Sequence, residues 1–406
     1  MKNSFTELND MTASKYNLGY CTNVHAGEDL DRYMSSLERY AVDVKSQTPG
    51  AGPLDVGLWL SARTARQILT ENRLAEFRGF LESRGLTAFT MNGFPYGNFH
   101  ADTVKFQVYE PDWTKPQRLD YTVNLIRILA RLMPEDSQAG ISTLPLGWPR
   151  DDFDRRKAAD HLILIADLLR VHELRTGKLI HLDIEPEPGC MLSSSGEVVS
   201  FFKNYLLPGR VESEVLRYIR VCHDICHASV VFENQKDAIA NYAANGIRIG
   251  KVHVSSAIEA EVAAENSQVV LDQLKTFRED RYLHQTYLKQ TDGIVSYDAL
   301  PQAIDEIGTG KEGTLRCHFH VPIFIERFGH LRTTGKEIID CLNSIYQMSD
   351  CRTFEVETYA WTVLPDELKT DDLAGGIAKE LHWMQERLEK LSASDKPADK
   401  AVSLRT

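Results

Sequence analysis

The 406-residue sequence has no long apolar run, no Cys-x-x-Cys pair and no block of five or more Lys and Arg residues. The first absence excludes a transmembrane helix, which needs roughly 18 consecutive apolar residues. The second argues against a zinc ribbon. The third, together with a formal net charge of −12, leaves a polyanion such as DNA no basic surface to bind. We therefore expect no nucleic-acid partner.

Cysteine usage and the chain ends indicate the cellular setting and the extent of the domain. Seven cysteines, an odd number in a long chain, predict reduced thiols. The N-terminal residues lack the apolar core of a signal peptide, so we expect a cytoplasmic protein. The polar residues 1–14 predict a flexible N-terminus, and residues 392–406, rich in Ser, Lys, Asp and Ala, predict a disordered tail. A hydrophobic content of 43% supports one large domain over residues 15–391.

Short β-type runs alternate with amphipathic helical stretches along this domain, which predicts a parallel sheet. Several runs are apolar on both faces, as strands buried under helices are. Helical periodicity occurs at 29–46, 62–84, 117–133, 151–176, 211–216 and 334–348. The predicted fold class is α/β, a (β/α)8 TIM barrel. The runs are Leu18–Val24, Val56–Leu60, Ala88–Asn92, Gly140–Leu144, Leu179–Glu185, Tyr218–Asp224, Ile247–Val254, Leu315–Val321 and Thr353–Tyr359.

Nine runs are one too many for a barrel of eight strands. The run Leu315–Val321 follows a segment, 256–312, that shows no clean strand-helix unit. We therefore expect an insertion before the last strands. Either one of the last three runs lies outside the barrel, or the first run pairs irregularly.

Acidic and histidine side chains occupy the ends of the later runs. The C-terminal ends of barrel strands converge on one pocket. Carboxylates and imidazoles that converge in this way are metal ligands before they are anything else. We therefore predict a metal site built from these side chains. The candidate ligands are Glu185, Asp224, His227, His253, His318, His320 and Glu357.

The fifth run ends in an unusually acidic sequence. Pro186 stops the ladder hydrogen bonds, so Glu185 lies at or near the strand end. Asp183, Glu185 and Glu187 would share one face if the strand continued, and three carboxylates there would repel unless a cation neutralised them. The alternative is a set of solvated acids in a loop.

The sixth and seventh runs add an Asp-x-x-His motif and a single histidine. Asp224 and His227 face one site if a helix starts at residue 225. The alternative is an Asp that caps the helix and a His packed in the core. His253 lies inside an apolar run, so a packed core histidine is the alternative to a ligand there.

The last two runs each carry a pair of polar side chains on one face. His318 and His320 alternate, so they bind a metal together or form an exposed polar face. Glu355 and Glu357 also share a face, and Glu357 is preferred as the ligand because it is nearer the strand end. The alternative for Glu355 is a salt bridge at the bottom of the barrel.

Further polar side chains near the strand ends are candidate substrate contacts. The irregular loop after the third run offers amide, phenol and imidazole groups. Arg63 and Lys105 could bind a carboxylate or phosphate, or could be ordinary surface cations. The candidate substrate-binding residues are His25, Asn92, Tyr96, His100, Glu187 and Ser255.

A Glu at the fifth strand, Asp-x-x-His at the sixth, His at the seventh and Glu at the last resemble the xylose isomerase-like TIM barrel superfamily. That group includes sugar isomerases, ketose epimerases and nucleases of the endonuclease IV type. The resemblance implies a divalent metal, Zn, Mn, Mg or Co, held by Glu185, Asp224, His253 and Glu357. It also implies that His227 lies beside the metal or the substrate.

Longer strings resemble the EboE family of metabolite traffic proteins between about residues 18 and 368. This resemblance implies a small-molecule substrate and other ebo-pathway proteins as partners. The strings are TNVHAGE, NGFPYGNFH, ISTLPLG, DIEPEPGC, HFHVPIF and EVETYAWTVLP.

The leading functional hypothesis is a metal-dependent isomerase or epimerase acting on a small polyhydroxy metabolite. Glu185 and Glu357 would be its catalytic residues, moving a proton at the carbon next to a carbonyl. A lyase or hydrolase reaction is also compatible with such a site. One alternative is a non-catalytic metabolite-binding or transport accessory protein. Another is a metallophosphodiesterase of the endonuclease IV type, which the acidic charge disfavours but the extra histidines, His318 and His320, keep open.

Overall fold

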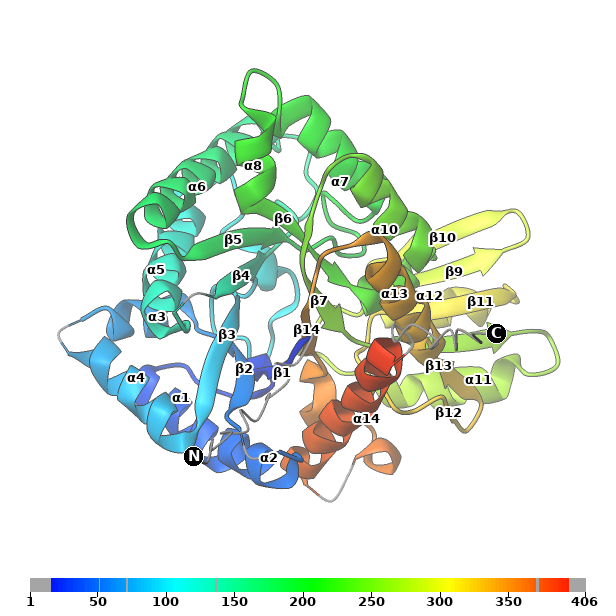
Figure 1. The fold of residues 1–406 in the computed structure, drawn as a ribbon. Helices are drawn as coiled ribbons and strands as arrows, with labels where there is room; N and C mark the ends of the chain where they lie inside the picture. Colours follow the sequence, from blue (N-terminus) through cyan, green and yellow to red (C-terminus); the bar gives the residue numbers. More distant parts are fainter. Residues whose placement is uncertain (1–15, 51, 71, 136, 370–371, 394–406) are drawn as a thin grey trace, which may run out of the picture.

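The computed structural model describes residues 16–50, 52–70, 72–135, 137–369 and 372–393. The expected flexible N-terminus, 1–14, lies outside the described residues, as does 394–406 of the expected tail. Eight parallel strands form a closed barrel in the order β1-β14-β7-β6-β5-β4-β3-β2, with helices around it (Figure 1). This confirms the predicted (β/α)8 barrel. The strands are β1 (Asn17–Cys21), β2 (Leu54–Trp59), β3 (Leu86–Asn92), β4 (Gln138–Thr143), β5 (Leu179–Ile184), β6 (Ile219–Asp224), β7 (Ile249–Val254) and β14 (Thr353–Val356).

The helices that surround the barrel cover the outer faces of its strands. None of the described helices combines the length and the apolar character that a bilayer crossing requires. The helices are α1 (Leu30–Ser36), α2 (Val42–Gln47), α3 (Ala62–Ile68), α4 (Arg73–Arg84), α5 (Pro116–Leu132), α6 (Arg155–Thr176), α7 (Ser195–Phe201), α8 (Glu212–Tyr218), α9 (Ile225–Val230), α10 (Gln235–Ala244), α13 (Gly335–Met348) and α14 (Leu373–Ala393), with π-helical turns at Leu37–Ala41 and Phe202–Leu206 and 3-10 turns at Thr22–Val24, Lys105–Tyr109, Tyr359–Val363 and Asp366–Leu368.

Local sequence signals set where these helices begin and end. Helix α6 starts where the Asp154 side chain accepts a hydrogen bond from the Lys157 amide, and it ends at Gly177, whose φ is 73°. The stretch 62–84, which reads as one helix, is instead α3 and α4. The two are separated at Asn72, whose φ of 58° lies outside the helical region.

The predicted insertion lies between β7 and β14 and forms a second, antiparallel sheet of six strands at the side of the barrel (Figure 1). The run Leu315–Val321 contributes β11 to this sheet and is the one outside the barrel. The stretch 256–312 gave no clean signal because strands such as β10 are mostly exposed and lack an apolar run. The sheet order is β10-β9-β11-β8-β13-β12, and the elements are β8 (Ile258–Val262), β9 (Thr286–Gln290), β10 (Gly293–Tyr297), β11 (Gly313–Cys317), β12 (Arg327–Phe328), β13 (Leu331–Thr333), α11 (Ser267–Leu274), the 3-10 turn Lys275–Phe277 and α12 (Leu300–Ile307).

The barrel interior contains a buried ion pair. The Nζ atom of Lys251 lies 2.6 Å from Oε2 of Glu355, and neither side chain is exposed. The Thr90 hydroxyl donates to the same carboxylate oxygen at 2.6 Å. Glu355 fits only because Gly57 faces it, since a Cβ at that position would lie 1.8 Å from its Oε1. This layer therefore neutralises its own charge below the strand ends.

A second buried carboxylate joins the last helix to the barrel. Glu380 on α14 accepts hydrogen bonds from the Thr358 hydroxyl at 2.6 Å, the Trp361 indole at 3.0 Å and the Ile323 amide at 3.1 Å. Burial raises the pKa of Glu380 to about 7. This side chain thus connects α14 both to the segment after β14 and to the insertion.

Replacing Lys251 by Met should destabilise the fold strongly, because Glu355 would keep a buried charge without its partner. We expect Lys251→Met to lower the free energy of unfolding by about 3–5 kcal/mol in urea titrations. Adding Glu355→Gln should recover most of the loss. As a control, Arg78→Gln, which breaks the exposed 2.7 Å pair with Glu82, should cost less than about 1 kcal/mol. An equally small loss for Lys251→Met would show that the buried pair does not stabilise the barrel.

Glu380 should make stability depend on pH. Its folded pKa of about 7 lies above the ordinary value of 4.5, so the folded state keeps a proton that the unfolded state loses between these values. Its contribution is complete below the lower pKa and is lost as pH rises toward the upper one. Between roughly pH 4.5 and pH 8, the unfolding free energy of the parent should fall relative to that of Glu380→Gln by about 3 kcal/mol. Glu389→Gln, on an exposed position of the same helix, should track the parent; parallel pH profiles for the parent and Glu380→Gln would contradict the assignment.

Candidate metal centre

Four side chains from four strands or strand ends meet at one point of the barrel. The register aligns Asp224 of β6 with His253 of β7, and His253 with Glu355 of β14, two residues before Glu357. One ligand atom from each of Glu185, Asp224, His253 and Glu357 lies within 4.8 Å of all the others, and all four residues are buried. The structure therefore brings together, out of the seven candidate ligands, the four residues that the family resemblance implies.

One ring nitrogen of His253 faces all three carboxylates. Its Nδ1 atom lies 3.1 Å from Oε1 of Glu185, 3.3 Å from Oε2 of Glu357 and 3.9 Å from Oδ2 of Asp224. Burial would lower the pKa of His253, but the carboxylates around it raise that pKa well above its usual value. Burial likewise would raise the pKa of Glu357, but His253 lowers it to about 2. Burial raises the pKa of Asp224. The cluster thus has an excess of buried negative charge that one imidazole cannot balance.

Asp224 and Glu357 each have one oxygen held by hydrogen bonds and another that faces His253, and Oε1 of Glu185 also faces His253. Asp224 accepts hydrogen bonds at Oδ1 from the His227 amide and the Ser255 hydroxyl, both at 2.8 Å. Its Oδ2 atom has no hydrogen-bond partner among the described residues, and the same is true of Oε2 of Glu185. Buried polar atoms without a partner are rare in proteins. These oxygens and the His253 nitrogen are a donor set that fits a divalent cation.

Glu357 is oriented by two asparagines, one in the 3-10 turn after β1 and the other at the end of β3. Its Oε1 atom accepts from Nδ2 of Asn23 at 2.8 Å and from Nδ2 of Asn92 at 2.9 Å. Glu355, the other candidate on this strand, lies below the cluster with Lys251, and its Oε2 atom is 3.6 Å from Nε2 of His253. The geometry therefore brings Glu357 into the cluster and leaves Glu355 in the salt bridge beneath it.

Three further histidines form a second group beside the first. His227 and His318 approach each other through their Nε2 atoms at 3.1 Å. The Nδ1 atoms of His227, His318 and His320 lie 2.9 Å from the Pro186 carbonyl, 2.8 Å from the Gln285 side-chain oxygen and 2.6 Å from the Glu357 carbonyl. Each Nδ1 must donate to its acceptor oxygen, so each neutral ring has its lone pair on Nε2.

The Nε2 atoms of His227 and His318 face each other and need a proton or a cation between them. Burial lowers the pKa of His227 and of His320, and lowers the pKa of His318 well below its usual value. Two neutral rings would direct lone pairs at each other, which is unfavourable unless a proton or a cation lies between them. Asp224, His227 and His320 can supply one further set of ligand atoms within 4.8 Å of one another, and Glu187, His227 and His318 another.

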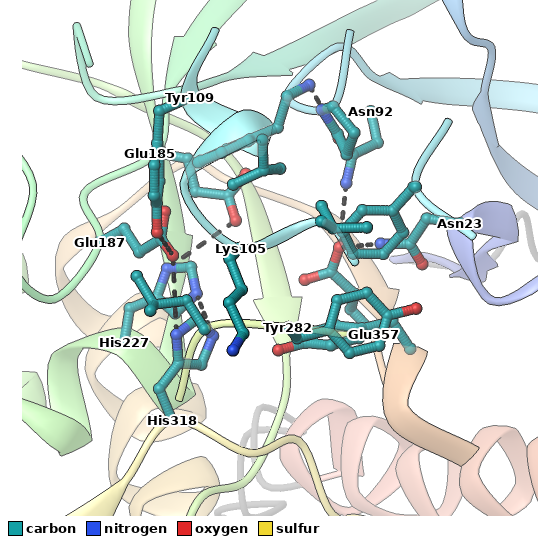
Figure 2. A pocket seen from close by; sticks show the side chains of 17 residues that line it. Asn23, Asn92, Lys105, Tyr109, Glu185, Glu187, His227, Tyr282, His318 and Glu357 are labelled. Atoms are coloured by element: carbon teal, nitrogen blue, oxygen red, sulfur yellow. Dashed lines mark hydrogen bonds and ion pairs between the residues drawn. The ribbon is translucent and has the colours of Figure 1, made fainter. Parts of the chain in front are cut away.

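A cavity opens above these groups and encloses about 60 Å³, several times the space that one water needs. Figure 2 shows carboxylates and imidazoles on one side of it and the asparagine-held Glu357 on the other. Its lining residues are Asn23, Asn92, Phe94, Pro95, Phe99, Val104, Lys105, Val108, Tyr109, Glu185, Glu187, His227, Tyr282, Leu283, His318, Glu357 and Tyr359.

Of the candidate substrate contacts, Asn92 and Glu187 line the cavity and the others do not. His25 packs against Tyr40 with ring centroids 5.1 Å apart, and burial lowers its pKa to about 3. His100 bonds to the Asn23 carbonyl at 2.7 Å. The other two residues also lie behind the wall, with Tyr96 against Tyr121 and Ser255 bonded to Asp224.

Glu187 is a buried acid of the cavity wall that lies outside the four-residue group. It accepts hydrogen bonds from the Tyr109 hydroxyl at 2.8 Å and from Nε2 of Gln285 at 3.0 Å. Burial raises its pKa to about 8, although these two donors oppose the shift. Tyr109, Gln285 and Tyr282 were missed from the sequence because they lie on long connections rather than at strand ends. No spacing signal distinguishes them.

No family model matches the sequence, and no curated protein matches it. Among solved structures, a xylose isomerase-like TIM barrel protein from Mycobacterium smegmatis in complex with magnesium is 11% identical, covers 93% of this chain and 97% of its own, and has a TM-score of 0.50. An L-ribulose 3-epimerase is 13% identical over 93% and 96% of the two chains, with a TM-score of 0.47. The IOLI protein with a bound zinc atom is 9% identical over 94% and 100%, also at 0.47.

Identities this low show likeness of fold and do not carry an activity from one protein to another. The first of these structures matches over nearly the full length of both chains. The predicted fold class is therefore confirmed at this level: the chain has the fold of a xylose isomerase-like TIM barrel.

Proposed function

We propose that this protein is a divalent-metal-dependent isomerase or epimerase that acts on a small, sugar-like polyhydroxy metabolite. The observation that carries the proposal is the convergence of Glu185, Asp224, His253 and Glu357 from four strands beneath one small cavity. Three buried carboxylates around one imidazole favour the binding of a cation. The small cavity is compatible with a metabolite and too confined for a polymer.

The four residues would hold the metal through the oxygens that lack other partners and through Nδ1 of His253. Mixed nitrogen and oxygen ligands suit Zn, Mn, Mg or Co. When bound, such an ion supplies Lewis-acid polarisation of a carbonyl and a template for two adjacent substrate oxygens.

Glu185 and Glu357 are the catalytic residues in this proposal. They come from the separate strands β5 and β14 and both line the cavity, so they can approach a bound molecule from different sides. One would remove a proton at the carbon next to the carbonyl and the other would return it. Asn23 and Asn92 hold one oxygen of Glu357, which leaves the other to face the site.

A proton-transfer function predicts exchange of substrate hydrogen with solvent. We expect the metal-loaded protein, incubated in heavy water with a panel of ketoses and aldoses, to introduce deuterium next to the carbonyl of at least one sugar, as followed by NMR. A chelator should stop the exchange, and Glu185→Gln or Glu357→Gln should slow it by at least ~100-fold. Glu261→Gln, a change of an exposed carboxylate on β8, is the matched control.

Binding of a sugar without any exchange would contradict the catalytic proposal and favour the second candidate function, a non-catalytic carrier. The resemblance of several strings to the EboE family supports such a role in an ebo-type metabolite traffic pathway, with other proteins of that pathway as partners. The same pocket would then bind an intermediate and release it unchanged.

Replacing Asp224 tests the metal site itself. Asp224→Ala should abolish metal binding, and Asp224→Asn should do so while keeping the oxygen that caps α9. We expect either change to lower metal affinity beyond the ~10–100-fold that loss of a supporting residue costs. The measurement is metal content after dialysis against a fixed free ion concentration. His223→Gln is the control, because His223 bonds to Gln235 and lies outside the four-residue group; unchanged stoichiometry in Asp224→Asn would refute the assignment.

The same metal analysis bears on a third candidate, a metallophosphodiesterase. The observation in its favour is the group of His227, His318 and His320 beside the first site, which offers ligands for another ion. Two adjacent ions suit the hydrolysis of a phosphodiester. A measured content of one metal ion per chain would contradict the metallophosphodiesterase candidate and leave the isomerase proposal.

A further inference from the structure

The mouth of the cavity holds two hydrogen-bond donors that the proposed proton transfer does not use. Lys105 is the one Lys or Arg among the cavity-lining residues of the described chain. Tyr282 lines the cavity from the insertion and is 5% exposed, and its hydroxyl makes no well-aligned hydrogen bond in the part that the structure describes, where the Arg281 side chain is its polar neighbour. Figure 2 shows Lys105 in front of the cavity, in the view between His318 and Tyr282. A buried hydroxyl without a well-aligned hydrogen bond indicates a missing ligand.

Backbone hydrogen bonds join the two segments that carry these residues. The amides of Val104 and Lys105 both donate to the carbonyl of Arg281, the residue before Tyr282, at 2.7 and 3.0 Å. Lys105 has a φ of 38°, in a region that a lysine rarely adopts. Such strain persists only where the surroundings impose it, and it concentrates at functional sites. The barrel loop and the insertion thus bring the two residues together.

Both donors are available to an incoming anion. The ion-pair partner of Lys105 is Asp280, 3.3 Å away and 96% exposed, so water already competes for this pair. Burial raises the pKa of Tyr282 to about 12, so the phenol keeps its proton at neutral pH.

We infer that the substrate of this site carries an anionic group, a carboxylate or a phosphate, at the end remote from the metal ligands, and that Lys105 and Tyr282 bind that group. This inference deepens the proposed function, because it assigns one end of the metabolite to the four-residue group and the other to the cavity mouth. It makes Lys105 a specificity-determining residue. A neutral sugar would leave the Tyr282 hydroxyl and the lysine ammonium without their best partner.

Three ligands with one carbon skeleton test the inference on the full-length protein: glycerol, glycerate and glycerol phosphate. Titration calorimetry of the parent should show at least one of the anions binding ~10-fold or more tightly than glycerol. Lys105→Gln should remove that preference, and Tyr282→Phe should reduce anion affinity by ~3-fold. Neither change should alter glycerol binding. Lys115→Gln removes an exposed cation from the same connection and should have no effect.

The anion that binds more tightly identifies the end group, and either result supports the inference. Equal binding of the three ligands would overturn it, as would an anion preference that survives Lys105→Gln. Equal loss of glycerol and anions in Lys105→Gln would show a packing role instead. Repeating the titrations after chelation separates the two proposals. If metal binds but no Lys105-dependent preference exists, only the anion site fails; if the preference persists but no metal ever binds, only the metal function fails.

Discussion

The interaction on which the site depends is the contact of one imidazole nitrogen with three buried carboxylates. Nδ1 of His253 lies between 3.1 and 3.9 Å from oxygens of Glu185, Glu357 and Asp224. Removing charges from water is costly, and the cost is recovered only when opposite charge and hydrogen bonds surround them. A single imidazolium cannot neutralise three carboxylates. The fold therefore leaves an excess of negative charge at this end of the barrel, which a bound cation would neutralise.

The alternation of side chains along the strands explains how the barrel tolerates this arrangement. Every second residue of a strand points inward, so Lys251 and His253 of β7 lie in successive layers, as do Glu355 and Glu357 at β14. In the lower layer Lys251 and Glu355 pair directly. In the upper layer the corresponding pair, His253 and Glu357, lies beside two further acids, Glu185 and Asp224. The lower pair is balanced without any ligand, whereas the upper layer, which faces the cavity, has more carboxylates than its one imidazole can balance.

The barrel and the candidate ligands at its strand ends were predictable from sequence because both depend on period and position. Parallel strands alternate with helices, and strand ends converge, so seven candidate ligands could be named before any geometry was known. The family resemblance then implied the four residues Glu185, Asp224, His253 and Glu357. Two of the alternative interpretations describe real contacts. Asp224 caps α9 as well as facing the cluster. Glu355 forms a salt bridge, which was the alternative to a role as ligand. His25, by contrast, stands at a strand end and packs in the core.

The part of the site that could not be predicted from the sequence is the cavity wall contributed by the insertion. Its strands are short and partly exposed, so they leave no apolar period, and its contacts with the barrel join residues far apart in the chain. Gln285 fixes the tautomer of His318 and also donates to Glu187, which ties the second histidine group to this buried acid of the wall. Tyr282 comes from the same segment. The barrel thus supplies the four-residue group Glu185, Asp224, His253 and Glu357, while the insertion shapes the space above it. Chemistry that distinguishes this protein from other barrels with similar strand ends must therefore be sought in residues 255–334.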